Sequence, residues 1–273
     1  MGGIALFGGR ISFMSEKKLS FGIIGVGKMG SALAYALKDD FPLLLYDKFK
    51  IPDDLKSYER KLEEVLSESD IIILAVKPKD IYDVVSDVAD LANSNYKLVV
   101  SSAAGIRSDF LRRYIKRWAR IMPSLTISQK EGVVAILAGL QEDAKILENI
   151  FKNYSKTFVV KSDDEIDVFT ATSASGPGYL SVIFEAFEDA IVRAGLPRDV
   201  AREVSAHTFL GIAKMIISGK VPSQIKEEVM TPGGTTAEAI VEINDVRKAI
   251  FFAVEKALTK SKLISADLSY TKK

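Results

Sequence analysis

The chain has 273 residues, of which 48% are hydrophobic and 27% are charged, and this composition is typical of a folded globular protein. The formal net charge of +1 is spread along the chain, without the basic excess that is usual in nucleic-acid-binding proteins. There is no cysteine and only one histidine, His207, which argues against disulfides, a thiolate nucleophile and a metal site. No apolar run is long enough to span a bilayer, and we expect a cytoplasmic protein that binds neither membrane nor nucleic acid.

Residues 1–18 are expected to form a flexible arm rather than part of the fold. Their apolar part is short, is broken by glycines and lacks the basic start of a signal peptide. A second methionine, Met14, stands just before a charged stretch, and this pattern is typical of an over-long predicted start.

Short apolar runs alternate with amphipathic stretches between residues 19 and 162. Strands are expected at 19–25, 41–47, 70–78, 97–105, 119–124, 132–139 and 156–161. Helices are expected at 28–40, 57–69, 79–92, 108–115 and 142–154. Continuous apolar strands separated by helices are buried on both faces, so this segment predicts a Rossmann-type, doubly wound and mainly parallel sheet.

From residue 163 to residue 273 the alternation stops and helical periodicity takes over. Helices are expected at 164–174, 178–195, 197–219, 222–229 and 236–262. These stretches are apolar on more than one face, and such helices need partners on every side. The fold class is therefore α/β followed by all-α, with a helical substrate-binding and dimerisation domain that forms a homodimer.

The run FGIIGVGKMG contains the pattern GxGxxG directly after a predicted strand and at the start of a predicted helix. Gly25 permits a tight turn, Gly27 lets the backbone approach a pyrophosphate, and Gly30 allows close packing of helix on strand. The helix start offers free N–H groups to phosphates. We expect this turn to bind a dinucleotide, although a plain strand–helix turn also satisfies the pattern. The expected contact residues are Gly25, Val26, Gly27, Lys28, Met29 and Gly30.

Asp47 closes the second predicted strand, at the distance where the dinucleotide pattern places an acidic residue. A carboxylate there binds the ribose hydroxyls of NAD and repels the 2′-phosphate of NADP. Lys48 and Lys50 follow directly and can neutralise such a phosphate. The cofactor is expected to be NADH or NADPH. Asp47 favours NADH, unless this residue serves only as a cap on the strand end.

Two further strand ends are expected at the same crevice, because ligands of open α/β sheets bind beyond the carboxyl ends of the strands. The first ends in Val76, Lys77 and Pro78, and the second in Ala103, Ala104 and Gly105. Small residues and a proline-stiffened turn suit loops that lie against a flat adenosine or nicotinamide. Lys77 is also explained as a solvated surface lysine.

The run VMTPGGTTA, residues 229–237, interrupts the C-terminal helices with one proline, two glycines and three threonines. Gly233 and Gly234 can expose successive N–H groups, which together with the next helix start form an anion site. A turn between two helices, with Thr235 or Thr236 as the N-cap, explains the residues equally well.

Six motifs occur in a fixed order: GVGKMG, AVKPKD, SSAAGI, RIMPS, SASGPGYL and VMTPGGTTAEAI. In this order the chain resembles the pyrroline-5-carboxylate reductase family from about residue 19 to residue 262. The last motif is specific to that family, whereas many dehydrogenases share the first. The resemblance implies NAD(P)H-dependent hydride transfer to the C=N carbon of 1-pyrroline-5-carboxylate, which gives L-proline, in a dimer or a ring of dimers.

The resemblance also implies a substrate site. Thr236 is the implied catalytic residue, because its hydroxyl would hydrogen-bond the ring nitrogen. The implied substrate-binding residues are Thr231, Gly233, Gly234, Thr235, Thr236, Met122, Pro123 and Ser175. A protonated cyclic imine already attracts a hydride, so a site with one histidine and no cysteine is adequate for this chemistry.

The chain departs from the family at two places. Lys28 stands where the family usually has asparagine, and Ser124-Leu125-Thr126 stands where it often has Asn-Thr-Pro. One alternative is a β-hydroxyacid dehydrogenase or another imine reductase of the same architecture, since Lys214 in GIAKM matches a lysine motif of those dehydrogenases. We interpret Lys214 as structural, because an imine needs less acid help than a carbonyl. An alternative of another class is a non-catalytic nucleotide-binding sensor.

Overall fold

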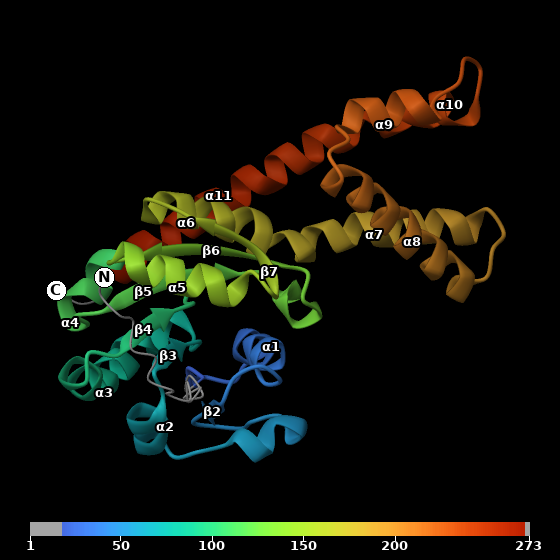
Figure 1. The fold of residues 1–273 in the computed structure, drawn as a ribbon. Helices are drawn as coiled ribbons and strands as arrows, with labels where there is room; N and C mark the ends of the chain where they lie inside the picture. Colours follow the sequence, from blue (N-terminus) through green and yellow to red (C-terminus); the bar gives the residue numbers. More distant parts are fainter. Residues whose placement is uncertain (1–17, 271–273) are drawn as a thin grey trace, which may run out of the picture.

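The structure is a computed structural model that describes residues 18–270, with side chains described as far as residue 266 (Figure 1). The predicted arm, residues 1–18, lies outside the described residues except for Lys18. A seven-stranded sheet with its helices comes first, and an arm of helices follows it (Figure 1). The predicted order of α/β and then all-α is confirmed.

The sheet has the strand order β2-β1-β3-β4-β5-β6-β7. Its strands are β1 (Phe21–Ile24), β2 (Leu43–Tyr46), β3 (Ile71–Leu74), β4 (Leu98–Ser101), β5 (Trp118–Pro123), β6 (Gly132–Ala138) and β7 (Ser155–Val159). All neighbouring strands are parallel except β5 and β6, which are antiparallel. The carboxyl ends of β1 to β4 therefore meet along one edge.

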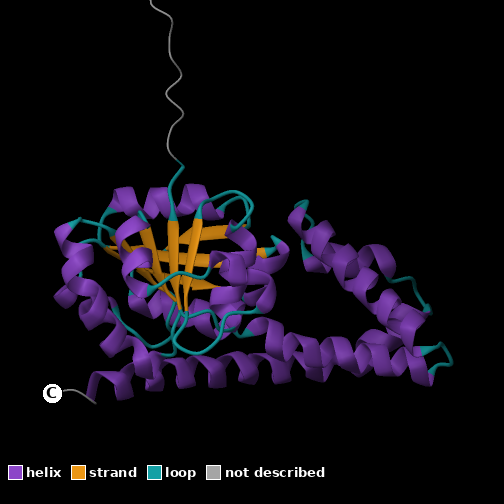
Figure 2. Ribbon diagram, turned by 90° about the horizontal axis from the view of Figure 1, so that it is seen from below, coloured by secondary structure: helices purple, strands orange, loops and turns teal. Residues whose placement is uncertain are grey.

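Alternate residues of the buried strands, such as β1 to β4, enter different cores, which explains the unbroken apolar runs. In β1, Ile23 packs with α1 (Lys28–Leu37) and α5 (Gln141–Phe151) on one face. Ile24 packs on the other face with α2 (Leu62–Glu68), α3 (Ile81–Ser94) and α4 (Ser108–Tyr114). Figure 2 shows helices on both faces of the strands, so the sheet is doubly wound as predicted.

The predicted helix over 57–69 is wrong in its first half. A 3-10 turn, Asp53–Tyr58, ends there, and α2 begins only at Leu62. Between them Glu59 forms a parallel bridge with Leu45, and the N–H of Arg60 donates to the Leu45 carbonyl at 2.8 Å. Pairing with β2 keeps this backbone extended, because the same groups cannot also bond within a helix.

The helical arm consists of α6 (Asp163–Phe169), a π-helical turn (Thr170–Ala174), α7 (Gly176–Arg193), α8 (Arg198–Ile217), α9 (Pro222–Val229), α10 (Thr235–Glu242) and α11 (Val246–Tyr270). The helix predicted over 236–262 is in fact two helices separated by a 3-10 turn, Ile243–Asp245. Of the arm, α6 and the π-helical turn lie against the sheet and α11 packs on these two, whereas α9 and α10 lie at the far end of the arm (Figure 1).

Large apolar side chains of the arm are exposed in the single chain. They include Leu180, Val182, Phe187, Val200, Val204, Phe209, Leu210, Ile212, Ile217, Val241, Phe251 and Phe252. Within the described chain α9 and α10 bury none of their residues. An apolar surface of this extent marks a protein–protein interface. Across residues 18–270, none of the helices combines the length and apolar character that a membrane span needs.

Candidate active site

The glycine turn after β1 has the geometry of a phosphate cradle. Gly25 has φ +92°, and a Cβ atom on Gly30 would lie 1.9 Å from the Gly25 carbonyl oxygen. A Cβ on Gly27, in contrast, would meet no described atom within 4 Å. Gly25 and Gly30 are therefore required by the protein itself, whereas Gly27 borders open space that a ligand can occupy.

The start of α1 points its free backbone groups at that space. Gly27 is the N-cap of the helix, and no described side chain caps it or places an acid in the first turn. Lys28 is exposed in that turn, and Met29 packs partly against the core. Unpaired N–H groups and the positive end of a helix dipole bind phosphate, so this turn can hold the pyrophosphate of a dinucleotide.

Asp47 lies against the glycine turn. Its Oδ2 accepts the N–H of Val26 at 2.6 Å and its Oδ1 accepts the N–H of Phe49 at 2.8 Å. A carboxylate oxygen has lone pairs left after one such bond, so ribose hydroxyls can still bind. The next three residues are exposed, and Phe49 is 92% exposed. Asp47 thus shapes the turn, and its role at a ribose stays a prediction.

The two other strand-end loops border the same edge. Val76 contacts the glycine turn closely enough that a Cβ on Gly25 would lie 2.8 Å from its Cγ1. Lys77 and Pro78 begin the next 3-10 turn. Ala103 is buried, and Gly105 takes a left-handed φ of +77° where the chain turns into the loop before α4.

Ala104 connects this edge to the implied nicotinamide side. It packs against a cluster that includes Met122 at the end of β5, and Ala174 of the π-helical turn packs against the same cluster. Ser175 follows directly, and its hydroxyl donates to the Thr170 carbonyl at 2.7 Å. Pro123, which ends β5, is also buried. The structure therefore brings Ala104, Met122, Pro123 and the Ser175 segment together.

The departure Ser124-Leu125-Thr126 has a structural account. Ser124 is buried, its Oγ accepts the N–H of Val133 at 2.9 Å, and it lies 2.8 Å from Oγ1 of Thr126. Leu125 is 43% exposed and begins a 3-10 turn that packs on α1. These hydroxyls stabilise the turn, and Leu125 is the side chain it leaves open.

The loop between α9 and α10 is not brought to this edge by its own chain. Gly233 has φ +69°, the N–H of Gly234 donates to the Thr231 carbonyl at 2.9 Å, and Gly234 is the N-cap of α10. An N-cap at Thr235 or Thr236 is therefore wrong. Figure 1 shows α10 at the opposite end of the arm from the strand ends. Lys214, in the last turn of α8, is exposed as well.

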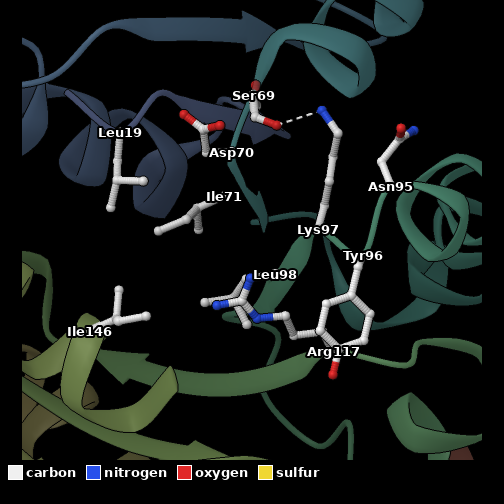
Figure 3. A pocket seen from close by; sticks show the side chains of 10 residues that line it. All are labelled: Leu19, Ser69, Asp70, Ile71, Asn95, Tyr96, Lys97, Leu98, Arg117 and Ile146. Atoms are coloured by element: carbon white, nitrogen blue, oxygen red, sulfur yellow. Dashed lines mark hydrogen bonds between the residues drawn. The ribbon is translucent and has the colours of Figure 1, made fainter. Parts of the chain in front are cut away.

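A separate pocket lies at the amino ends of β3 and β4, the edge opposite the glycine turn (Figure 3). Its cations are already satisfied by protein groups. Lys97 Nζ donates to the carbonyls of Ser67 and Ser69 at 2.6 Å each, and Arg117 pairs with Asp143 at 2.6 Å. This pocket is not the dinucleotide site.

One charged group beside the site, the buried Arg120 of β5, was not predicted from the sequence. Its signal was present, since an arginine inside an apolar strand is costly unless it is paired. The residue that pairs with it, Asp163, is more than forty positions away, and no local pattern connects the two.

Comparison with known proteins agrees with this geometry. The family model for pyrroline-5-carboxylate reductase dimerisation matches residues 163–264, and the model "NADP oxidoreductase coenzyme F420-dependent" matches residues 47–105. Pyrroline-5-carboxylate reductase of Pisum sativum is 32% identical over 90% of this chain and 96% of its own. That of Escherichia coli K12 is 31% identical over 92% of this chain and 99% of its own.

Solved structures agree as well. Plasmodium falciparum pyrroline carboxylate reductase with NADP bound aligns with a TM-score of 0.83 at 26% identity, over 91% of this chain and 99% of that one. The Coxiella burnetii reductase aligns with a TM-score of 0.80 at 25% identity, over 92% and 99%. The resemblance inferred from the motifs is confirmed, and the chain belongs to the pyrroline-5-carboxylate reductase family.

Proposed function

We propose that the protein reduces 1-pyrroline-5-carboxylate to L-proline with NADH or NADPH. The observation that carries the proposal is the open space at Gly27 in the glycine turn after β1, and a second glycine-rich turn at Gly233 and Gly234, where Gly233 has a left-handed φ of +69°, supports it as a candidate anion site. A redox sensor has no evident need of the second turn. Family membership supports the same activity.

The residues fit a nicotinamide dinucleotide, because Gly27 leaves room for a phosphate and α1 offers uncapped N–H groups. Asp47, which bonds the glycine turn, would bind the adenosine ribose, and Ala104 and Met122, which share one cluster, would orient the nicotinamide. When bound, this cofactor supplies the hydride that the imine carbon accepts. Asp47 favours NADH, as the sequence predicts, while Lys48 and Lys50 provide charge that tolerates NADPH.

The substrate groups belong to the loop at the far end of the arm, and a partner subunit must bring such a loop to this sheet. The single chain leaves α10 remote from its own strand ends, and the arm matches a dimerisation model (Figure 1). We therefore place each site between the sheet of one subunit and the loop of the other. The homodimer follows from this arrangement, and a ring of dimers and a cytoplasmic location remain predictions.

In that loop the N–H groups of Gly233, Thr235 and Thr236 would bind the substrate carboxylate, because the N–H of Gly234 is already donated within the turn. Thr231 holds the turn, since its carbonyl accepts the N–H of Gly234 at 2.9 Å. The hydroxyl of Thr236 would accept a hydrogen bond from the protonated ring nitrogen and so hold the imine in place. The nitrogen keeps its proton during the transfer, and no strong acid is required at that moment.

The test is oxidation of NADH and NADPH with pyrroline-5-carboxylate, measured for the wild type and for Thr236→Ala. The matched control is Thr259→Ala, which removes an exposed hydroxyl that bonds only within its own helix. We expect turnover by the wild type and the control, and a loss of about tenfold or more in Thr236→Ala. No turnover with either cofactor would refute the proposed function, and unchanged turnover in Thr236→Ala would refute the role of that hydroxyl alone.

A further inference from the structure

A cluster of charged and hydroxyl side chains is enclosed where the sheet meets the helical arm. It joins β5, α4, α6 and α11, and its members are far apart in the sequence. We call it the Arg120 cluster, consisting of Arg107, Arg120, Asp163, Asp167 and Ser261. None of these residues belongs to the proposed cofactor or substrate contacts.

Arg120 and Asp163 hold α6 to the sheet. Arg120 is 1% exposed and its Nη1 pairs with Asp163 Oδ1. Asp163 also accepts the N–H of Ser108 at 3.0 Å and its hydroxyl at 2.7 Å. Burial lowers the pKa of Arg120 against the opposing charge of Asp163. Burial would raise the pKa of Asp163, but the Ser108 hydrogen bonds and Arg120 outweigh it and lower that pKa.

Asp167 holds α6 to α11. It is 1% exposed, and its Oδ1 accepts the hydroxyl of Ser261 at 2.8 Å and that of Ser265 at 3.4 Å. Arg107 Nη1 lies 3.9 Å from its Oδ2. Both serines are buried, so these bonds are enclosed where α11 packs on α6 and the π-helical turn.

The cluster is better explained by a role in orienting the helices on the sheet than by a contribution to the stability of the fold. Arg120 Nε and Nη2 have no hydrogen-bond partner among the described residues, although the side chain is fully buried. Enclosed ion pairs are often no more stabilising than apolar residues of the same size, because desolvation offsets the attraction. Directional bonds between three elements do, however, fix the angle at which those elements meet.

The angle between the sheet and the helical arm affects candidate site residues on the sheet and on the arm. Arg120 lies two residues before Met122 on the same face of β5, and α6 leads through the π-helical turn to Ser175. On the other side, α11 runs from Ser261 back to Val246, beside the loop and α10. The fifteen residues between them span about 22 Å, so a tilt of about 5° at the cluster shifts the sheet by about 2 Å relative to the far end of the arm.

We propose that Arg120, Asp163, Asp167 and Ser261 are positioning residues that set the angle of the cofactor-binding sheet on the helical body. They thereby set the fit between the cofactor on one subunit and the loop supplied by the partner subunit. The inference rests on the proposed function. A misplacement of about 1 Å at a reacting centre can cost about 100-fold in rate, so small tilts have large effects.

The first experiment separates positioning from binding. Ser261→Ala removes the hydroxyl at 2.8 Å and leaves Asp167 with the weaker Ser265 contact. We expect kcat to fall about tenfold, while the calorimetric dissociation constant for the cofactor stays within about twofold because the glycine turn is untouched. Asp167→Asn serves as the stronger variant. Thr259→Ala, on the same helix but exposed, is the control and should match the wild type.

The second experiment asks which site the cluster serves. Heterodimers of Ser261→Ala with Thr236→Ala are isolated with two different affinity tags. If the cluster positions its own sheet against the partner's loop, one site contains neither change, and the heterodimer keeps about half of the wild-type rate. If the cluster acts on its own loop, every site carries a defect and only about one tenth or less remains.

The outcomes are distinguishable. Absence of wild-type turnover refutes the proposed function and this inference with it. Wild-type turnover with an unchanged kcat in folded Ser261→Ala and Asp167→Asn refutes the inference alone. A parallel loss of cofactor affinity, or a heterodimer rate of about one tenth or less, also overturns it, because a positioning role for the sheet predicts neither.

Discussion

Gly27→Ala is expected to separate the stability of the glycine turn from its function. Gly27 has φ −71° and ψ −165°, an extended conformation that alanine adopts without strain, and the added Cβ would meet no described atom within 4 Å. Alanine at an N-cap costs about 0.5–1 kcal/mol, whereas replacing glycine stabilises by about 0.4–1 kcal/mol through the unfolded state. The two nearly cancel, so the free energy of unfolding without cofactor should change by less than about 0.5 kcal/mol.

Cofactor binding should respond very differently to the same change. The methyl group occupies the space through which the backbone of this turn approaches a pyrophosphate, and we expect affinity to fall by about ten- to 100-fold. At a cofactor concentration of 100 times the wild-type dissociation constant, binding stabilises the wild type by about 2.7 kcal/mol. In the variant that gain should fall to between about 1.4 and 0.4 kcal/mol.

The assay is thermal unfolding of both proteins with and without NADPH, together with calorimetric titration. Wild type and variant should unfold at nearly the same temperature alone and at different temperatures with cofactor. A variant that gains as much from NADPH as the wild type would refute the assignment of the open space at Gly27 to the pyrophosphate. A variant destabilised without cofactor would show that the structure misses a contact at this position.

Three further outcomes are expected. Gly30→Ala should lower both stability and cofactor affinity in the same assays, because its Cβ would lie 1.9 Å from the Gly25 carbonyl oxygen. Asp47→Ala should raise the ratio of kcat/KM for NADPH to that for NADH, and an unchanged ratio would show that Asp47 is not the selector. Asp163 has a lowered pKa in the folded state. Its carboxylate therefore contributes its full share of the free energy of unfolding at pH values above the ordinary carboxyl range, and this share is lost as the pH falls through the folded-state pKa. Urea unfolding of Asp163→Asn below about pH 4 should therefore depend less steeply on pH than that of the wild type.

Local sequence patterns were sufficient to predict the sheet. Strands such as β1 and β3 are buried at every position, and a run of apolar residues next to glycine or proline is an unmistakable sign of such a strand. The GxGxxG turn was predictable for a similar reason, since Gly25 and Gly30 are explained by contacts within a few residues or with the segment that follows the adjacent strand, and Gly27 borders open space. The extended segment at Glu59 was not, because its pairing with Leu45 depends on tertiary structure.

The candidate site was only half predictable from the residues of one chain. The motifs identified the glycine turn, the strand ends and the loop at 229–237, but no pattern indicates that the loop lies away from its own sheet. The Arg120 cluster was missed because its bonds join residues far apart in sequence, such as Asp167 and Ser261, 94 positions apart. Such pairs leave no periodic signal, and a single arginine or aspartate is common in any sequence.

The proposed division of the site between two subunits also explains why the loop is built as it is. Gly233 has a left-handed backbone conformation. The loop and α10 are largely exposed and bury no side chain within their own chain. Ordering such a segment costs conformational entropy that contacts in the single chain do not offset. The compensating contacts must come from the partner subunit and the substrate. Stability and activity should therefore decline together on dilution, since both depend on the same association.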